Sequence, residues 1–354
     1  FLTAPAASGG FGMEQASALH IYGIFAGLAF SMPVLGGWLA DRYLGERRGV
    51  WLGGMGILLG NLTLFVTGSL PAIGGADGAD ATRRMLLWLG LGLIVAGTGL
   101  LKPAISALIG RIYDRETSRS RRAGYTVFMV GIWTGSLAGT LFTGIAGEAI
   151  GWRWGFLVAT VGMAIGLAAY VLLAPRILGD IGHKRDAQAA SSAANDARAA
   201  PTLSAGERRQ RMLLIVVMSL FTAAYAVAFY QKGGVLNLFV SSSTDRQVGA
   251  IEIPASVFLA VSTGGFILLA PVLEMLFARL ERRGIVLDVF TKQIGALFML
   301  MLGYVFFILA GMESARSGDG LHSLWWIVIG YLFFSIGDVL MVKAQRHSEQ
   351  DLSH

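Results

Sequence analysis

Nine long apolar segments constrain this chain more than any other feature of its sequence. Each can cross about 30 Å of hydrocarbon, which takes about 20 residues of helix. Of the 354 residues, 55% are hydrophobic and only 14% are charged, a composition that excludes an ordinary soluble domain. The segments lack the period-two alternation of a barrel strand, so we predict an all-α, polytopic transmembrane helix bundle. The predicted spans are residues 16–40, 50–70, 85–110, 124–147, 154–174, 212–240, 254–280, 288–312 and 321–342.

The distribution of basic residues predicts the orientation of these spans. Lys and Arg accumulate in cytoplasmic loops. One set of alternating loops holds 20 of the 28 basic residues, whereas the opposite set holds 5. The sequence therefore places its first residues outside and its last residues inside. This bias also explains the net charge of +6, so the predicted surroundings are a lipid bilayer and not a nucleic acid.

Polar composition divides the chain into two halves. Residues 175–211 are rich in Asp, Lys, Arg, Ala and Ser and predict a cytoplasmic linker, with residues 187–200 compatible with a short amphipathic helix or with disorder. Five spans in residues 1–174 precede the linker, four in residues 212–342 follow it, and residues 343–354 form a hydrophilic tail. Two helix bundles joined by a long loop are typical of secondary transporters.

Cysteine and histidine usage gives no sign of a cofactor. The chain has no cysteine, so disulfides and thiolate metal sites are excluded. No pair among the five histidines has the spacing of a metal site on one helix face. We therefore expect no metal, no cofactor and no enzymatic activity.

Lys102 is the main candidate functional residue, because it lies inside the predicted span 85–110. A charged group in hydrocarbon costs roughly 3 kcal/mol or more, so it normally faces a protein interior or a wet cavity. The alternative is a lysine that reaches toward the basic loop beginning at Arg111.

A charged loop follows the first span, from Gly36 to Arg48. Asp41 can cap the next helix or pair with an arginine, and Gly45 permits a tight turn. With Arg42 and Arg47, these residues form a candidate gating loop that would latch two helices in one transport state. The alternative is an ordinary basic inner loop.

The chain resembles the proton-dependent oligopeptide transporters, a branch of the major facilitator superfamily. The stretch Gly36 to Arg47 is similar to a family loop motif, and Gly97 to Pro103 is similar to its Gly-x-Gly-x-x-Lys-Pro signature. Further matches, in order, are Gly151 to Phe156, Leu178 to Gly182, Phe229 with Gln231 and Gly233, Leu236 to Phe239, Ile253 to Ser256, Leu269 to Pro271, and Gly330 to Phe333.

The resemblance implies twelve core helices with both ends cytoplasmic. The nine spans align with the second to tenth, so the first and the last two family helices are expected to be missing. The family's first-helix Glu-x-x-Glu-Arg-Phe motif does not occur in this sequence. The hydrophilic stretch after Asp338 also departs from the family pattern. A fragment and a decayed gene remain alternatives.

The resemblance also implies roles for individual residues. Lys102 matches the lysine that holds the peptide carboxylate, and Asp338 stands where the family has a glutamate that holds the amino group. Gln231, Ser262, Trp133 and Phe30 would line the space. Several departures suggest a divergent cavity: Trp133 replaces an asparagine, Tyr230 replaces a glutamate, Ser262 and Thr263 replace Asn-Pro, and Phe30 replaces a tyrosine.

The resemblance and the departures from it leave three functions open. The first is a symporter, coupled to protons, that imports di- or tripeptides or a related zwitterion by alternating access. The second is a transport-incompetent or truncated relative that acts as a receptor or scaffold. The third is a transporter of another small anionic metabolite. The sequence predicts no oligomeric state.

Overall fold

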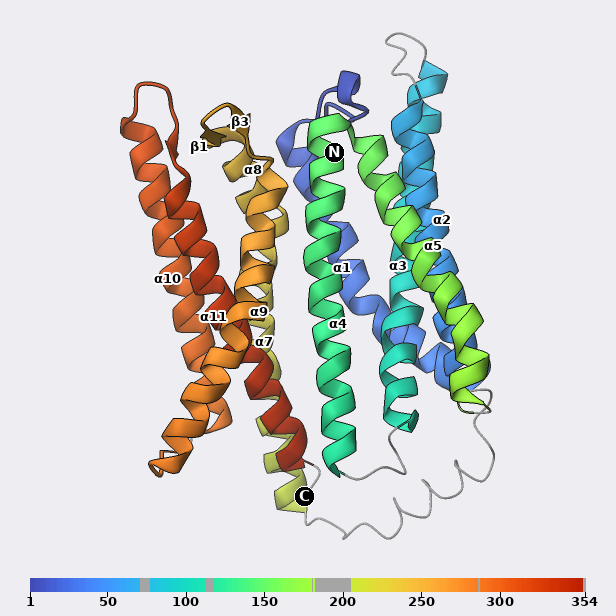
Figure 1. Ribbon diagram of the computed structural model, residues 1–354, viewed down its shortest axis with the longest axis vertical. Coiled ribbons are helices and arrows are strands. Elements are labelled where there is room, and N and C mark those ends of the chain that lie inside the picture. Colours follow the sequence, from blue (N-terminus) through green and yellow to red (C-terminus); the bar gives the residue numbers. More distant parts are fainter. Residues whose placement is uncertain (71–76, 113–117, 180, 182–204, 286, 353–354) are drawn as a thin grey trace. The chain divides into compact units, whose positions relative to one another are not determined.

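The computed structural model describes residues 1–70, 77–112, 118–179, 181, 205–285 and 287–352 (Figure 1). Within these ranges, nine helical segments are long and apolar enough to cross a membrane, which confirms the predicted all-α fold. The long helices are α1 (Gln15–Leu39), α2 (Glu46–Ser69), α3 (Asp77–Ile112), α4 (Ser118–Ile145), α5 (Trp152–Leu178), α7 (Ala205–Phe229), α9 (Ala255–Arg282), α10 (Val289–Arg316) and α11 (Leu324–Leu352). A 3₁₀ turn, Tyr230–Gly233, joins α7 to the short α8 (Val235–Ser243), and both share one span.

Several helices run beyond the spans expected from hydropathy. Helix α5 ends at Leu178, α7 already begins at Ala205, and α11 continues to Leu352. Hydropathy marks where a helix leaves the membrane, but charged residues such as Arg, Lys and Glu are good helix formers. The helices therefore continue into polar sequence. The segment 187–200 lies outside the described residues.

The chain divides into two compact units, which are described separately. Unit 1 comprises Phe1–Ile132 and Phe142–Ala200, and unit 2 comprises Trp133–Leu141 and Pro201–His354. In unit 1, α3 packs on α1 and α2, and α2 also packs on α5. In unit 2, α11 packs on α9 and α10, and α10 also contacts α7.

Glycines bring α3 close to both of its neighbours in unit 1. A Cβ atom built on Gly36 of α1 would lie 2.1 Å from the carbonyl oxygen of Gly99 in α3. A Cβ atom on Gly53 of α2 would lie 2.7 Å from the carbonyl oxygen of Gly97. Small residues permit such backbone contact between membrane helices. These contacts fix the part of α3 that precedes Lys102.

We expect Gly36→Ala to destabilise the protein. The added methyl group would overlap the Gly99 carbonyl, which is backbone and cannot rotate away, and overpacking of this kind costs about 1–3 kcal/mol. Gly27→Ala is the matched control, because a methyl group added at this position of the same helix would meet no atom within 4 Å. Thermal unfolding of the purified protein, followed by tryptophan fluorescence, should show a lower Tm for Gly36→Ala only. Equal Tm values for the two variants would contradict the close packing.

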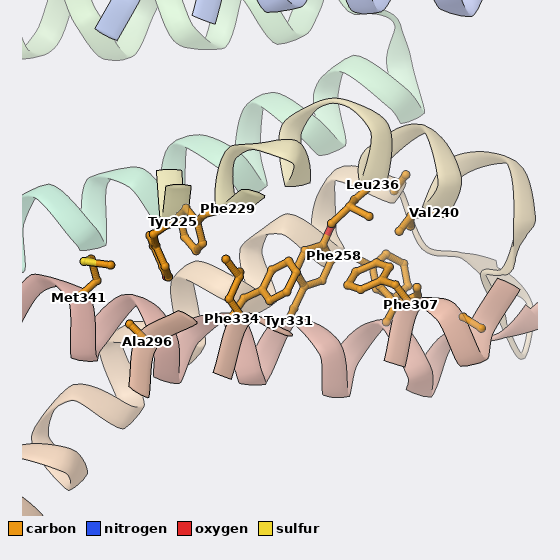
Figure 2. Packing of buried hydrophobic residues seen from close by; sticks show 14 residues of the cluster. Tyr225, Phe229, Leu236, Val240, Phe258, Ala296, Phe307, Tyr331, Phe334 and Met341 are labelled. Carbon is orange, nitrogen blue, oxygen red and sulfur yellow. The ribbon is translucent and has the colours of Figure 1, made fainter. Parts of the chain in front are cut away.

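An aromatic core holds unit 2 together (Figure 2). The rings of Phe307 and Tyr331 meet edge to face at 5.3 Å, and those of Tyr225 and Phe229 stack at 5.3 Å. Phe334 of α11 packs against Phe307 with ring centroids 5.7 Å apart. Aromatic pairs add about 0.5–1.5 kcal/mol each beyond their buried area. The core therefore fixes the face of α11 that carries Asp338 one turn further on.

Short strands tie together the ends of unit 2 that lie opposite its basic loops. Strand β1 (Thr244–Asp245) pairs in parallel with β4 (His322–Ser323), and β2 (Gln247–Val248) pairs antiparallel with β3 (Ile251–Glu252). The side chain of His322 is buried, with Nε2 3.0 Å from Thr244 Oγ1 and its ring stacked on Phe239 at 4.9 Å.

We expect acid to loosen this junction. Burial lowers the pKa of His322 below its ordinary value of 6.5. The unfolded chain therefore binds a proton at higher pH than the folded chain, and the free energy of unfolding decreases as the pH falls below about 6.5. Unfolding curves between pH 7.5 and 4.5 should show a weaker pH dependence for His322→Gln than for the parent protein. Identical pH profiles would contradict this role.

Candidate functional site

Lys102 lies on α3, on an exposed part of unit 1. Its Nζ atom is 5.2 Å from the ring centroid of Phe30 in α1. This is a cation–π contact, and it leaves donors of the ammonium free for another partner. The Phe30 side chain is 48% exposed. The structure thus brings together two of the predicted site residues, Lys102 and Phe30, both of which are exposed.

The candidate gating loop differs in part from the prediction. Residues Ala40–Leu44 form a π-helical turn that ends at Gly45, whose φ of +75° favours glycine. Gly45 is also the N-cap of α2, where no side chain caps the helix. Asp41 is exposed on the turn, and among the described residues it neither caps α2 nor forms an ion pair, so its part in gating stays a prediction.

Arg42 and Arg47 have different roles in this loop. The Arg42 guanidinium contacts the rings of Trp38 and Tyr43, at 5.9 and 5.7 Å from their centroids. Arg47 Nη2 donates hydrogen bonds to the carbonyl oxygens of Ala174 and Gly179, at 3.3 and 2.7 Å. Arg47 therefore joins the start of α2 to the end of α5, where carbonyl groups lack helical partners.

An ion pair that the sequence did not predict completes this junction. Glu46 Oε1 lies 2.7 Å from Arg111 Nη2 at the end of α3. The Glu46 side chain is only 5% exposed, whereas that of Arg111 is 30% exposed. We call Glu46, Arg47 and Arg111 the inner clasp, because together they tie α2, α3 and α5. Glu46 lies inside the motif that was interpreted as a loop, but its partner is 65 positions away, and only the folded chain reveals it.

Unit 2 contains a second charged cluster, around Asp338 of α11. Asp338 is 9% exposed, and the positive charge that acts on it comes from Lys232 in the turn after α7. Lys232 Nζ is 3.7 Å from the ring centroid of Phe229 and 3.4 Å from Oγ of the buried Ser262 in α9. Two predicted site residues, Asp338 and Ser262, therefore share a neighbour that the prediction did not include.

Two further predicted residues, Gln231 and Trp133, have different surroundings. Gln231 is exposed in the turn Tyr230–Gly233. Trp133 stacks on Phe266 of α9, with ring centroids 3.8 Å apart. An indole in this stack offers one donor and no acceptor, whereas an asparagine would offer both.

Lys232 could have been found from the sequence by the argument that found Lys102. Three of the 28 basic residues lie inside the predicted spans: Lys102, Lys232 and Lys292. The predicted site included Gln231 from this turn and left out Lys232, the next residue. Lys292 is buried near the start of α10 and lies close to Asp288, the N-cap of that helix.

Comparisons with known proteins agree with this architecture. A crystal structure of a mutant peptide transporter POT in complex with alafosfalin matches 97% of this chain and 75% of its own length, with a TM-score of 0.79 and 26% identity. A second, of a peptide transporter POT in complex with sulfate, has a TM-score of 0.78 and 26% identity. Nine membrane-length helices among the described residues, charges inside the spans and these fold matches define a transporter of the major facilitator superfamily.

The family follows from the sequence matches. The POT family model matches residues 48–186 and 182–353, and the chain belongs to this family of peptide transporters. The peptide transporter YePEPT of Yersinia enterocolitica is 28% identical over 393 residues, which cover 96% of this chain and 74% of that protein. A di-/tripeptide transporter of Lactococcus lactis is 37% identical over 161 residues, which cover 46% of this chain and 29% of the relative. The prediction of the family is confirmed.

Proposed function

We propose that this protein is a proton-coupled symporter that imports di- or tripeptides, or a related small zwitterion, across a bacterial inner membrane. The observation that carries the proposal is Lys102, an accessible ammonium inside a span, within the Gly97 to Pro103 signature. A charge at this depth has a large desolvation cost and is retained where it serves ligands or ions. The relatives described as peptide transporters support the substrate class.

In this proposal the substrate's two ends meet opposite charges. Lys102 would bind the peptide carboxylate, and Asp338 would attract the amino group. Gln231, Ser262, Trp133 and Phe30 would line the path, with bundles at residues 1–174 and 212–342. A proton that moves inward contributes about 2.3 kcal/mol per 100 mV, enough for about 40-fold accumulation of a neutral substrate.

We propose that the candidate gating loop holds the cytoplasmic ends of two helices together in one transport state. Its residues are Asp41, Arg42, Gly45 and Arg47. The contacts of Arg47 with the end of α5 support this role, since they must break if α2 and α5 move apart. The ion pair of Glu46 with Arg111 adds a second connection at the same end of unit 1.

A transport-incompetent relative is the second candidate, favoured by one observation. The stacked rings of Trp133 and Phe266 fill volume with apolar surface at a position where the resemblance expects a small amide. A bulky side chain here would narrow the space for a peptide. A receptor, or a carrier of a smaller anionic metabolite, would tolerate this change.

Uptake by proteoliposomes tests the proposal. The full-length protein should accumulate a radiolabelled dipeptide when the outside is acidic, and a protonophore should abolish the accumulation. Empty liposomes are the control. Uptake that does not depend on the proton gradient would contradict proton coupling. Binding of the peptide without uptake would favour a transport-incompetent relative.

A further inference from the structure

Lys232 is a charged group inside a span of unit 2 that the proposed mechanism does not use. Its ammonium lies between the face of Phe229, at 3.7 Å, and Ser262 Oγ, at 3.4 Å. A lysine ammonium has three donors, so one hydrogen bond and one aromatic face leave it incompletely compensated. Its remaining electrostatic partner is Asp338. Lys232 is thus held by α7 and α9. Ser262 also accepts, at its carbonyl oxygen, a hydrogen bond of 2.9 Å from Ser335 Oγ of α11, one turn before Asp338.

The charge of Asp338 is likewise incompletely compensated by direct contacts. Among the described residues, it forms no direct ion pair, and Lys232 is the cation whose field acts on it. The hydroxyl group of Tyr225, buried and without a hydrogen-bond partner, also lies within electrostatic reach of Asp338. A buried carboxylate is expensive unless a positive charge or donors compensate it. Lys232 supplies that charge from within the protein.

This arrangement changes which groups of a substrate unit 2 can bind. If Asp338 had no cation of the protein nearby, its carboxylate would require a cation from the substrate. Because Lys232 supplies an ammonium group, Asp338 does not require one. Tyr230 offers no carboxylate beside Lys232 in the same turn. Within unit 2, Lys232 and Asp338 together carry no net charge, so the pair does not select for a substrate with a free ammonium group.

We propose that Lys232 is a specificity-determining residue that serves as the internal counter-ion of Asp338. The substrates are small carboxylates whose amino group is blocked or absent, such as N-acyl peptides, and these are carried at least as well as peptides with a free amino group. The inference rests on the proposed function for transport and for the role of Lys102, and it assigns Asp338 to Lys232 instead of to the amino group of the substrate.

Competition between matched ligands tests the inference in proteoliposomes. For the full-length protein, Ala-Ala and N-acetyl-Ala-Ala should inhibit uptake with affinities within about threefold of each other, or with the acetylated peptide tighter. Lys232→Gln should raise the affinity for Ala-Ala relative to that for N-acetyl-Ala-Ala by about tenfold, because Asp338 then lacks its cation. Lys232→Arg should keep the parent ratio, and Lys232→Gln combined with Asp338→Asn should lose the new preference.

The chain offers a matched control in the same unit. Lys343 Nζ also lies over an aromatic ring, 5.0 Å from the ring centroid of Phe277, and it forms an ion pair of 2.8 Å with Glu274 Oε1. Lys343→Gln should leave the ligand ratio unchanged. A parent protein that binds the acetylated peptide far more weakly, or a ratio that Lys232→Gln does not change, would overturn the inference.

A binding measurement separates this inference from the transport function. Alaninamide carries an ammonium group and no carboxylate. It should raise the Tm of purified Lys232→Gln, in which Asp338 is uncompensated, and leave the Tm of the parent protein and of the double variant unchanged. Absence of peptide uptake in every variant would refute the proposed function alone, whereas stabilisation of the parent protein by alaninamide would refute the counter-ion role alone.

Discussion

Lys102→Ala is expected to abolish proton-driven peptide uptake. The substrate carboxylate would lose a charge-assisted contact that the bound substrate shields from water. Removal of one partner of such a contact costs roughly 2–5 kcal/mol, which is at least about a 30-fold loss in uptake at low substrate concentration. The measurement is initial uptake of a radiolabelled dipeptide by proteoliposomes at equal protein content.

Two variants separate the charge of Lys102 from its packing. Lys102→Arg keeps a cation and should retain part of the uptake. Phe30→Leu removes the ring beneath the ammonium, which is 5.2 Å from Nζ, and should cause a smaller loss, since cation–π contacts at exposed sites contribute about 0.5–1 kcal/mol. Near-normal uptake by Lys102→Ala, with unchanged Tm, would remove the basis of the proposed function.

The sequence predicted the spans because the bilayer imposes a single simple requirement. Every backbone polar group must be paired within the helix, and about 20 apolar residues must cover it. Helix ends outside the bilayer face no such requirement, so α5 and α11 extend beyond their predicted limits. Lys102 was predictable for the same reason, because a charge inside an apolar span is conspicuous.

Contacts between distant segments were not predictable. Asp41 and Glu46 are both acids of one short loop, and only the packing of α2 against α3 decides that Glu46 pairs with Arg111. In the same way, 106 positions separate Lys232 from Asp338, and their proximity follows from the packing of α7, α9 and α11. Sequence patterns identify which side chains are unusual, while the tertiary structure decides which of them meet.

The inner clasp leads to an asymmetric prediction, in which Arg111→Ala destabilises the protein more than Glu46→Gln does. Loss of Arg111 leaves the Glu46 carboxylate, 5% exposed, without a cation, and an uncompensated buried charge costs about 3–5 kcal/mol. Glu46→Gln removes the buried charge itself, while the partly exposed Arg111 can turn to water. We therefore expect a cost of about 1.5–3 kcal/mol for Glu46→Gln, as for a lost hydrogen bond to a charged group.

Thermal or denaturant unfolding, followed by the fluorescence of the tryptophans, measures both effects. Arg42→Ala is a control, because Arg42 is exposed and contacts only rings of its own loop in the described structure. The double variant Glu46→Gln with Arg111→Ala should be more stable than Arg111→Ala alone, since no buried charge is then left without a partner. Equal costs for the two single variants would mean that Glu46 reaches water in the folded protein, and the ion pair would then be a surface contact and not the part of the inner clasp that joins α2 to α3.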